Sequence, residues 1–174
     1  GVTKLAVEKT SPMPGGYELL EGHFSGALAP AGRHNSIIND IKLAPRNTAG
    51  KVEYSATFAI ARPTGAASGV LVYDVSNRGR GAPEALGNGH IDVLSGWQGD
   101  LAPGTERVVV PVAHNADGSS ITGPVLQRFS GVTAGTLSLS LAAGRTPASL
   151  EAAKATLTKR RAENSAVITI GSAD

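Results

Sequence analysis

The feature that most constrains this chain is how often its apolar segments are interrupted. The 174 residues include 22 glycines and 10 prolines, so nearly one residue in five favours a turn. A helix bundle needs long periodic segments, and this composition argues against them. We therefore expect many short elements joined by turns, at a spacing of about ten residues that is typical of a β-rich domain.

The clearest periodic segment covers residues 52–60, where apolar and polar side chains alternate. A period of two predicts a strand with one buried face. We predict that it forms an antiparallel hairpin with the β-branched run 37–43. Residues 1–16 are interpreted as an extended lead-in, and residues 17–28 as a short strand.

Residues 69–75 are different, because they are short and almost continuously apolar. Such a segment is typical of a strand buried on both faces, at the centre of a sheet. Residues 91–94 form a second short apolar strand. The segment 80–89 leaves about ten residues for a crossover, whereas parallel strands need about a dozen, so the relation of the two strands stays open.

The rest of the chain contains weaker signals. A short helical turn is expected at 83–86, and a single helix at 147–153, with Thr146 as its cap and Pro147 at its first position. Further strand candidates lie at 108–112, 121–129, 136–141, 155–158 and 167–170. Residues 114–118 are interpreted as a hairpin turn. The predicted fold is one mainly β domain over residues 1–174 with one or two short helices.

Charge and cysteine content exclude several classes of function. The chain has 16 basic and 14 acidic residues, and its longest basic run is 159–161. Binding to nucleic acid needs a basic stripe, so we expect no such partner. The absence of cysteine excludes disulfides and thiolate sites. No apolar run approaches the roughly 18 residues of a membrane span, so no transmembrane segment is expected.

Most motifs of catalysis and cofactor binding are also missing. No serine lies in a Gly-x-Ser-x-Gly elbow, so we expect no catalytic residue in this chain. Neither a phosphate loop nor a Gly-x-Gly-x-x-Gly fingerprint occurs. The four histidines lack metal-ligand spacing, and Asp117 alone cannot form a calcium loop. We therefore predict no metal and no cofactor.

Two loops stand out because each follows an apolar strand. One contains Asn77, Arg78 and Gly79, and the other contains Trp97 and Gln98. Ligands of open α/β sheets bind at the carboxyl ends of strands. A plain turn is the alternative for the first loop, and an indole that plugs a gap between loop and sheet is the alternative for Trp97.

These segments together resemble the N-terminal part of the bacterial α/β-hydrolase-domain family. The resemblance runs in order through most of the chain. It rests on residues 16–22, 43–47, 50–56, 71–79, 95–100, 121–125 and 153–158.

The resemblance implies a layout in which residues 1–103 hold the opening strands and the oxyanion loop, and residues 104–174 form a β excursion. Residues 37–61 would be antiparallel opening strands, and strands 69–75 and 90–94 parallel neighbours. Asn77, Arg78 and Gly79 would form the oxyanion loop, with Trp97 and Gln98 as pocket wall. The catalytic triad would lie beyond Asp174.

The resulting hypothesis is a non-catalytic segment of an esterase-like serine hydrolase, whose partner is the rest of that chain or a completing subunit. The chain begins at Gly1 instead of Met, so we expect a processed form or a piece of a longer protein. The residues themselves do not indicate a location, and the resemblance favours an exported one, periplasmic or secreted. The alternative is a self-contained β sandwich or barrel-like domain that binds a small ester or a carbohydrate, or serves as a scaffold, without catalysis.

Overall fold

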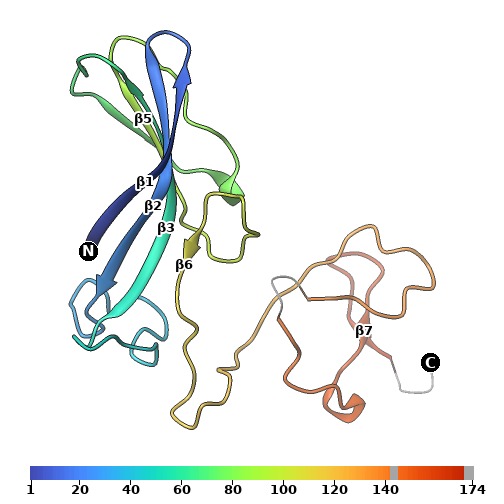
Figure 1. Ribbon diagram of the computed structural model, residues 1–174. Coiled ribbons are helices and arrows are strands. Elements are labelled where there is room, and N and C mark those ends of the chain that lie inside the picture. Colours follow the sequence, from blue (N-terminus) through green and yellow to red (C-terminus); the bar gives the residue numbers. More distant parts are fainter. Residues whose placement is uncertain (142–144, 171–174) are drawn as a thin grey trace. The chain divides into compact units, whose positions relative to one another are not determined.

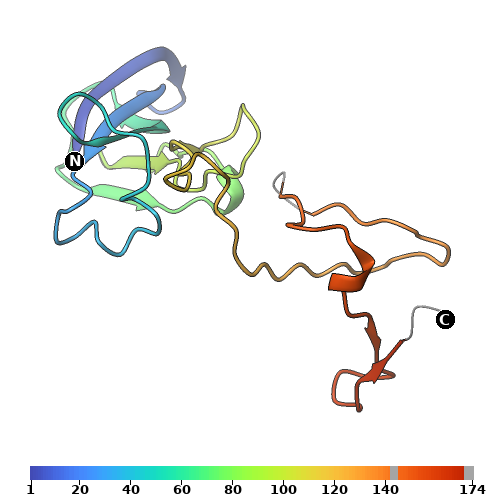
Figure 2. The same ribbon diagram turned by 90° about the horizontal axis from the view of Figure 1, so that it is seen from below.

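The computed structural model describes residues 1–141 and 145–170, and the chain divides into two compact units, Gly1–Ile121 and Thr122–Asp174. Figures 1 and 2 show the strands of the first unit and the extended segments of the second. The mainly β class predicted from the sequence is confirmed. The division between the two units falls after Ile121.

The first unit is built on three long antiparallel strands. They are β1 (Val2–Met13), β2 (Tyr17–Leu28) and β3 (Val52–Pro63), paired in the order β1-β2-β3. The strand predicted at 52–60 is confirmed, and its residues Val52, Ala56 and Phe58 are buried. The lead-in predicted for residues 1–16 is instead β1, because Gly15 and Gly16 at positive φ turn the chain back into β2.

The prediction of a strand at 37–43, paired in a hairpin with 52–60, is wrong. These residues form successive turns, in which N–H groups donate to carbonyls three residues earlier, as in Ile41 to Ile38 and Ala44 to Ile41. Ile41 and Ala44 are buried while Ile37 is 85% exposed, so the apolar side chains follow a period of three instead of two. The antiparallel partner of β3 is β2.

The other edge of β3 is shared by two short strands. β5 (Ile91–Ser95) pairs antiparallel with residues 58–61, and β6 (Val108–Val109) pairs with residues 55–56. The strands predicted at 91–94 and at 108–112 are therefore present, the second only in part. Leu94 is 1% exposed and Ala61 is fully buried at this junction, which makes it the best-packed part of the sheet.

β4 (Leu71–Asp74) pairs in parallel with β5, so the crossover left open by segment length is formed. β4 lies at the end of the sheet order β1-β2-β3-β5-β4, and all four of its residues are exposed. The prediction that 69–75 is a central strand buried on both faces is therefore wrong. The helical turn predicted at 83–86 is also wrong, because these residues have no regular secondary structure. A short 3-10 element, η1, lies earlier, at Asn77–Gly79.

The second unit has little regular structure in its described residues. β7 (Thr158–Lys159) pairs with β8 (Ile168–Thr169), and η3 is a single 3-10 turn at Ala152–Lys154. Of the strands predicted at 155–158 and 167–170, only the two-residue strands β7 and β8 form. The strands predicted at 121–129 and 136–141 do not form, and the helix predicted at 147–153 is reduced to η3. Between residues 122 and 170, no described residue is buried.

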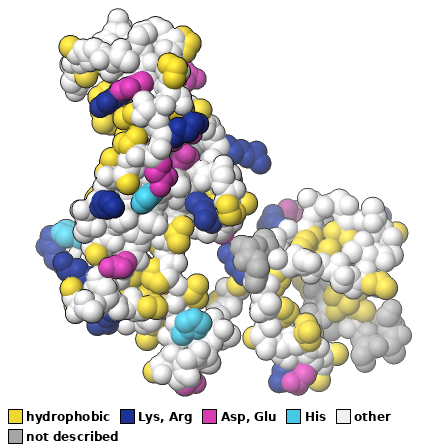
Figure 3. Space-filling model, in the orientation of Figure 1, with side chains coloured by type: hydrophobic (Ala, Val, Ile, Leu, Met, Phe, Trp, Pro, Cys, Tyr) yellow, Lys and Arg dark blue, Asp and Glu magenta, His cyan; other side chains and the backbone are white. Residues whose placement is uncertain are grey.

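Hydrophobic side chains also reach the surface of each unit, as Figure 3 shows in yellow. In the first unit they include consecutive residues of β4 and its flanks, with Leu71 59% and Val75 58% exposed. In the second unit Leu126 and Leu137 are almost fully exposed. An exposed apolar strand at the edge of a sheet is typical of an interaction surface, because native edges that stay free are protected by charges, bulges or a covering segment.

Candidate functional site

The parallel pairing of β4 and β5 brings the two predicted loops together. Parallel strands end at the same edge of a sheet, so the loop 76–79 after β4 and the loop 96–100 after β5 are neighbours. Side chains of the second loop, those of Trp97, Gln98 and Asp100, form hydrogen bonds with the first loop. We call this arrangement the loop junction, defined by residues 76–79 and 97–100.

The backbone of the first loop is unusual at two consecutive residues. Arg78 has φ +57° and Gly79 has φ +64°, both in the left-handed region. A Cβ on Gly79 would overlap the carbonyl oxygen of Glu106. The backbone N–H of Glu106 donates to the Gly79 carbonyl over 3.3 Å. Glycine is therefore required at position 79 by both backbone conformation and close approach, whereas Arg78 adopts a strained conformation.

Contacts with the second loop hold Arg78 in this conformation. The Arg78 backbone N–H donates to Gln98 Oε1 over 2.7 Å. Its guanidinium Nη1 donates to both carboxylate oxygens of Asp100, at 2.9 and 2.8 Å. Because both side chains of this ion pair are partly exposed, its contribution to stability is small, and its main effect is to orient the loop.

Trp97 contributes the third contact. Its indole Nε1–H donates to the Ser76 carbonyl over 2.7 Å, while 52% of the residue stays exposed. The interaction with a carbonyl agrees with the plug interpretation, and the exposed ring surface leaves the pocket-wall interpretation open. Gln98 is also engaged through its backbone, since its carbonyl accepts from Val108 N–H.

These contacts define what the loop junction can do chemically. The backbone N–H of Arg78 already has an acceptor, Gln98 Oε1, so it can serve a developing oxyanion only if Gln98 moves. The structure thus brings together Asn77, Arg78, Gly79, Trp97 and Gln98, but leaves the role of each one as a prediction.

Two polar residues near the carboxyl ends of β4 and β5 are buried, Ser76 in the loop junction and Asp92 within β5. Asp92 on β5 accepts the backbone N–H of Glu84 over 2.8 Å. Ser76 is 4% exposed, and its Oγ has no hydrogen-bond partner among the described residues. An unpaired buried hydroxyl is costly, on the order of 1–3 kcal/mol, so its retention calls for an explanation. No sequence pattern points to Ser76, because it is its burial in the folded unit that distinguishes this residue.

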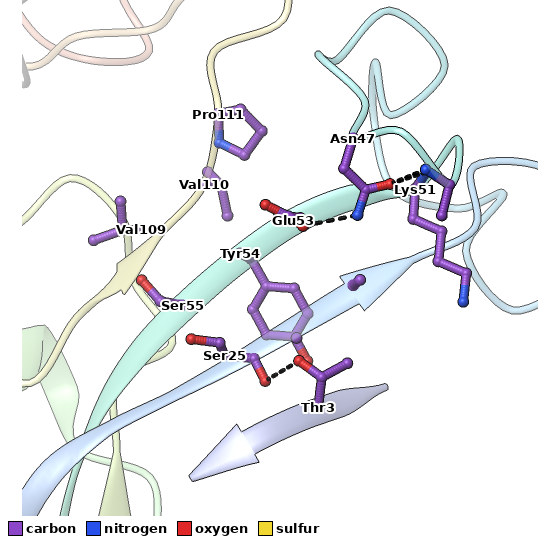
Figure 4. Close-up of a pocket in the computed structure, with 13 residues that line it drawn as sticks. Thr3, Ser25, Asn47, Lys51, Glu53, Tyr54, Ser55, Val109, Val110 and Pro111 are labelled. Carbon is purple, nitrogen blue, oxygen red and sulfur yellow. Dashed lines mark hydrogen bonds between the residues drawn. The ribbon is translucent and has the colours of Figure 1, made fainter. Parts of the chain in front are cut away.

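A second candidate site, which the sequence analysis missed, is an open pocket of about 650 Å³ on the β1–β3 sheet. Figure 4 shows Tyr54 at its centre, projecting from β3 across β2, with Val110 and Pro111 on the far side of Glu53. Asn47 Nδ2 donates to Glu53 Oε1 over 2.7 Å. We call this space the Tyr54 pocket.

A third space lies beside it, and we call it the apolar cavity. It measures about 300 Å³, is partly open to solvent, and is lined mainly by β3, the turns 38–44 and the segment 108–113. Its lining is aliphatic except for Tyr54 and three polar residues. The full lining comprises Leu28, Ile38, Asn39, Asp40, Ile41, Ala44, Val52, Glu53, Tyr54, Val108, Val110, Pro111 and Ala113.

The described residues contain no cluster of three or more histidine or acidic side chains that could hold a metal ion. His23 contacts Glu8, and His90 contacts Ser68, each through a single side-chain interaction. In the part of the chain that the structure describes, no helix has the length and apolar character to cross a membrane.

The predicted hairpin turn at 114–118 is formed, with His114 bridged to Ser120. Asp117 Oδ1 accepts the Ser119 hydroxyl at 2.7 Å and the Ser119 backbone N–H at 2.9 Å. These two hydrogen bonds, the hydroxyl first, hold the pKa of Asp117 below its usual value of 3.8. The carboxylate therefore closes a turn and is not arranged as an ion ligand.

Comparison with protein-family models, with curated proteins and with solved structures finds no match to this chain.

Proposed function

We propose that the Gly1–Ile121 unit is the N-terminal part of an esterase-like serine hydrolase with an α/β-hydrolase sheet. In this proposal it supplies the opening strands, the oxyanion loop at Asn77, Arg78 and Gly79, and a pocket wall at Trp97 and Gln98. The nucleophile, acid and histidine come from the chain beyond Asp174 or from a completing subunit.

The observation that carries the proposal is the loop junction at the carboxyl ends of two parallel strands. β4 and β5 end side by side, and Arg78 is tied to Gln98 and Asp100. This is the edge at which open sheets with parallel strands place their ligands. An antiparallel pairing of β4 and β5 would have put the two loops at opposite edges.

Two features support the idea that further structure completes this site. β4 is an apolar strand at the end of the sheet with all of its residues exposed, so an additional strand beside it would bury it. The Ser76 Oγ, buried within the loop junction, has no hydrogen-bond partner among the described residues, and a bound group or a neighbouring segment would supply one.

The first test is to read the source gene past the codon for Asp174. We expect the frame to continue into a further strand that ends in Gly-x-Ser-x-Gly, and its product to hydrolyse p-nitrophenyl esters. The 174-residue chain itself should not react with a fluorophosphonate serine probe. Labelling of this chain would overturn the proposal, as would a stop codon directly after Asp174 when no subunit that co-purifies with the native protein reacts with the probe.

The oxyanion role is tested in the longer, active chain by a matched pair of variants. Asn77→Pro removes one backbone N–H at a position where the preceding residue, Ser76, already has extended φ and ψ. Asn77→Ala keeps that N–H. If this N–H stabilises the oxyanion, the first variant loses about 10²–10³ in kcat and the second does not. Equal activities would exclude Asn77 as the donor.

A stand-alone binding module without catalysis is the second candidate. The apolar cavity favours it, because the cavity is formed entirely within the first unit and needs no further chain. A protein that stays monomeric and inactive, but binds a small ester or carbohydrate in a calorimetric titration, would support this candidate over the first.

A further inference from the structure

We propose that the first unit binds a neutral amphiphile with one aliphatic chain. The aliphatic chain lies in the apolar cavity, and the head group lies in the Tyr54 pocket. The inference does not depend on the proposed hydrolase function, because neither space includes a residue of the loop junction.

The shape and lining of the apolar cavity select an aliphatic chain. Its volume of about 300 Å³ lies at the small end of ligand pockets. Ile41, Ala44 and Val52 are its buried wall, and Leu28 and Ala113 pack against them. Since Tyr54 is its one aromatic residue, the cavity offers a flat aromatic ligand little to stack on, whereas methylene groups can fill it.

The apolar cavity and the Tyr54 pocket share four lining residues, Glu53, Tyr54, Val110 and Pro111. The two spaces lie beside each other near the end of β6. This strand ends at Val109, and the segment that follows diverges from β3 (Figure 4). The two spaces are therefore neighbours, and in our proposal one ligand occupies both.

The ring of Tyr54, a residue that lines both spaces, is held in place. A Cβ at Gly26 on β2 would overlap this ring, so the ring lies directly against the glycine backbone. Phe24 meets it edge to face, with ring centroids 6.3 Å apart and planes at 84°. A fixed ring is suited to pack against the first carbons of a bound chain or against a sugar ring.

The charges around both spaces favour a neutral head group. Lys51 and Glu53 have opposite charges in the Tyr54 pocket, and Asp40 adds a second carboxylate beside the cavity. An anionic head group in the Tyr54 pocket would meet one carboxylate and one ammonium group, so the pocket offers it no net positive charge, and its chain would lie beside the Asp40 carboxylate. The side-chain hydroxyls of Ser25, Ser55 and Thr3 also line the pocket, and they can bond a hydroxylated head.

The test is calorimetric titration of the 174-residue chain with alkyl glucosides below their micelle concentrations. We expect saturable binding of octyl glucoside, none of glucose, and weaker binding of octanoate. Affinity should rise about fourfold per methylene from hexyl to octyl, because each methylene leaves water for the cavity. Equal affinity for hexyl and octyl glucoside, or tighter binding of octanoate, would overturn the proposal.

A matched pair of variants locates the site. Ala113→Phe fills the cavity and should abolish binding, whereas Val112→Phe, at a neighbouring residue that is 72% exposed, should leave it unchanged. If Ala113→Phe does not fold, Ala44→Val is used, and it should shift the preference from octyl towards hexyl. Folded cavity variants that bind like the unmodified chain would contradict the assignment.

Discussion

At the scale of single residues, backbone conformation and close approach determine which positions tolerate change. Gly79 combines φ +64° with a backbone carbonyl where its Cβ would be, while Gly50 has φ +70° and open space around it. The two glycines share the conformational requirement but differ in packing. Their comparison therefore separates backbone strain from steric overlap.

We predict that Gly79→Ala destabilises the protein more than Gly50→Ala. The strain of left-handed φ alone should cost Gly50→Ala about 1–2 kcal/mol. Gly79→Ala adds displacement of the Glu106 backbone, for a total of about 3 kcal/mol or more. Urea denaturation measures both values. Equal losses would mean that the 105–107 segment moves aside at no cost.

A second prediction at this scale concerns pH. Because hydrogen bonds from Ser119 lower the pKa of Asp117, the turn gains stability above the unfolded pKa of about 3.8 and loses it as pH falls through the lower folded value. The amide resonance of Ser119 should titrate with a midpoint below 3.8. Asp117→Asn should remove this titration, and a midpoint at or above the usual value would contradict the prediction.

At the scale of elements, contacts between the loops stabilise conformations that neither loop would adopt alone. The left-handed Arg78 persists because Gln98 accepts its N–H and Asp100 holds its guanidinium. Trp97 ties the same loop through the Ser76 carbonyl. The two loops should therefore behave as one cooperative unit in local opening.

We predict that Gln98→Ala accelerates amide hydrogen exchange at Arg78, because the N–H loses its acceptor. Gln98→Glu keeps an oxygen at that position and should preserve most of the protection. Global stability should fall by about 1 kcal/mol in the alanine variant. Unchanged exchange at Arg78 in that variant would show that the loops are held by other contacts.

At the scale of the whole molecule, the two edges of the sheet are protected differently. The β1 edge contains charged residues such as Lys4, Glu8 and Lys9, and its pairing with β2 has two irregularities in register. Such charges and bulges oppose association between edges. β4 presents the apolar residues Leu71 and Val72 at the opposite edge.

We predict that the isolated chain self-associates through β4. Leu71→Lys should reduce the concentration-dependent increase in mass measured by sedimentation, with little loss of stability, because Leu71 is already 59% exposed. Ile37→Lys, at an 85% exposed residue outside the sheet, is the control and should leave association unchanged. Association equal in all three proteins would exclude β4 as the contact.

The two units should also differ in resistance to proteolysis. Since no described residue from 122 to 170 is buried, we expect trypsin to cut at Arg128 well before Lys9 within β1. The first product observed by mass spectrometry should retain residues 1–128. Early cleavage at Lys9 would mean that the sheet of the first unit opens as readily as the second unit.

The local pattern was sufficient to predict β3, β5 and the turn at 114–118. Alternation along 52–60 and turn residues such as Asn115 and Gly118 act through neighbouring residues, which the sequence displays directly. The pattern also placed Asn77–Gly79 and Trp97 in loops that follow strands. The mainly β class followed from the same short-range signals.

Only the tertiary structure decided the rest. A β-branched run is compatible with strand or turn, and burial of Ile41 and Ala44 against Val52 selected turns for 37–43. An apolar segment does not disclose its place in a sheet, so β4 at the edge could not be predicted. Residues distant in sequence form the apolar cavity and the hydrogen bond from Arg78 to Gln98, and such contacts depend on how the strands pair. The burial of the unpaired Ser76 hydroxyl depends on the same pairing.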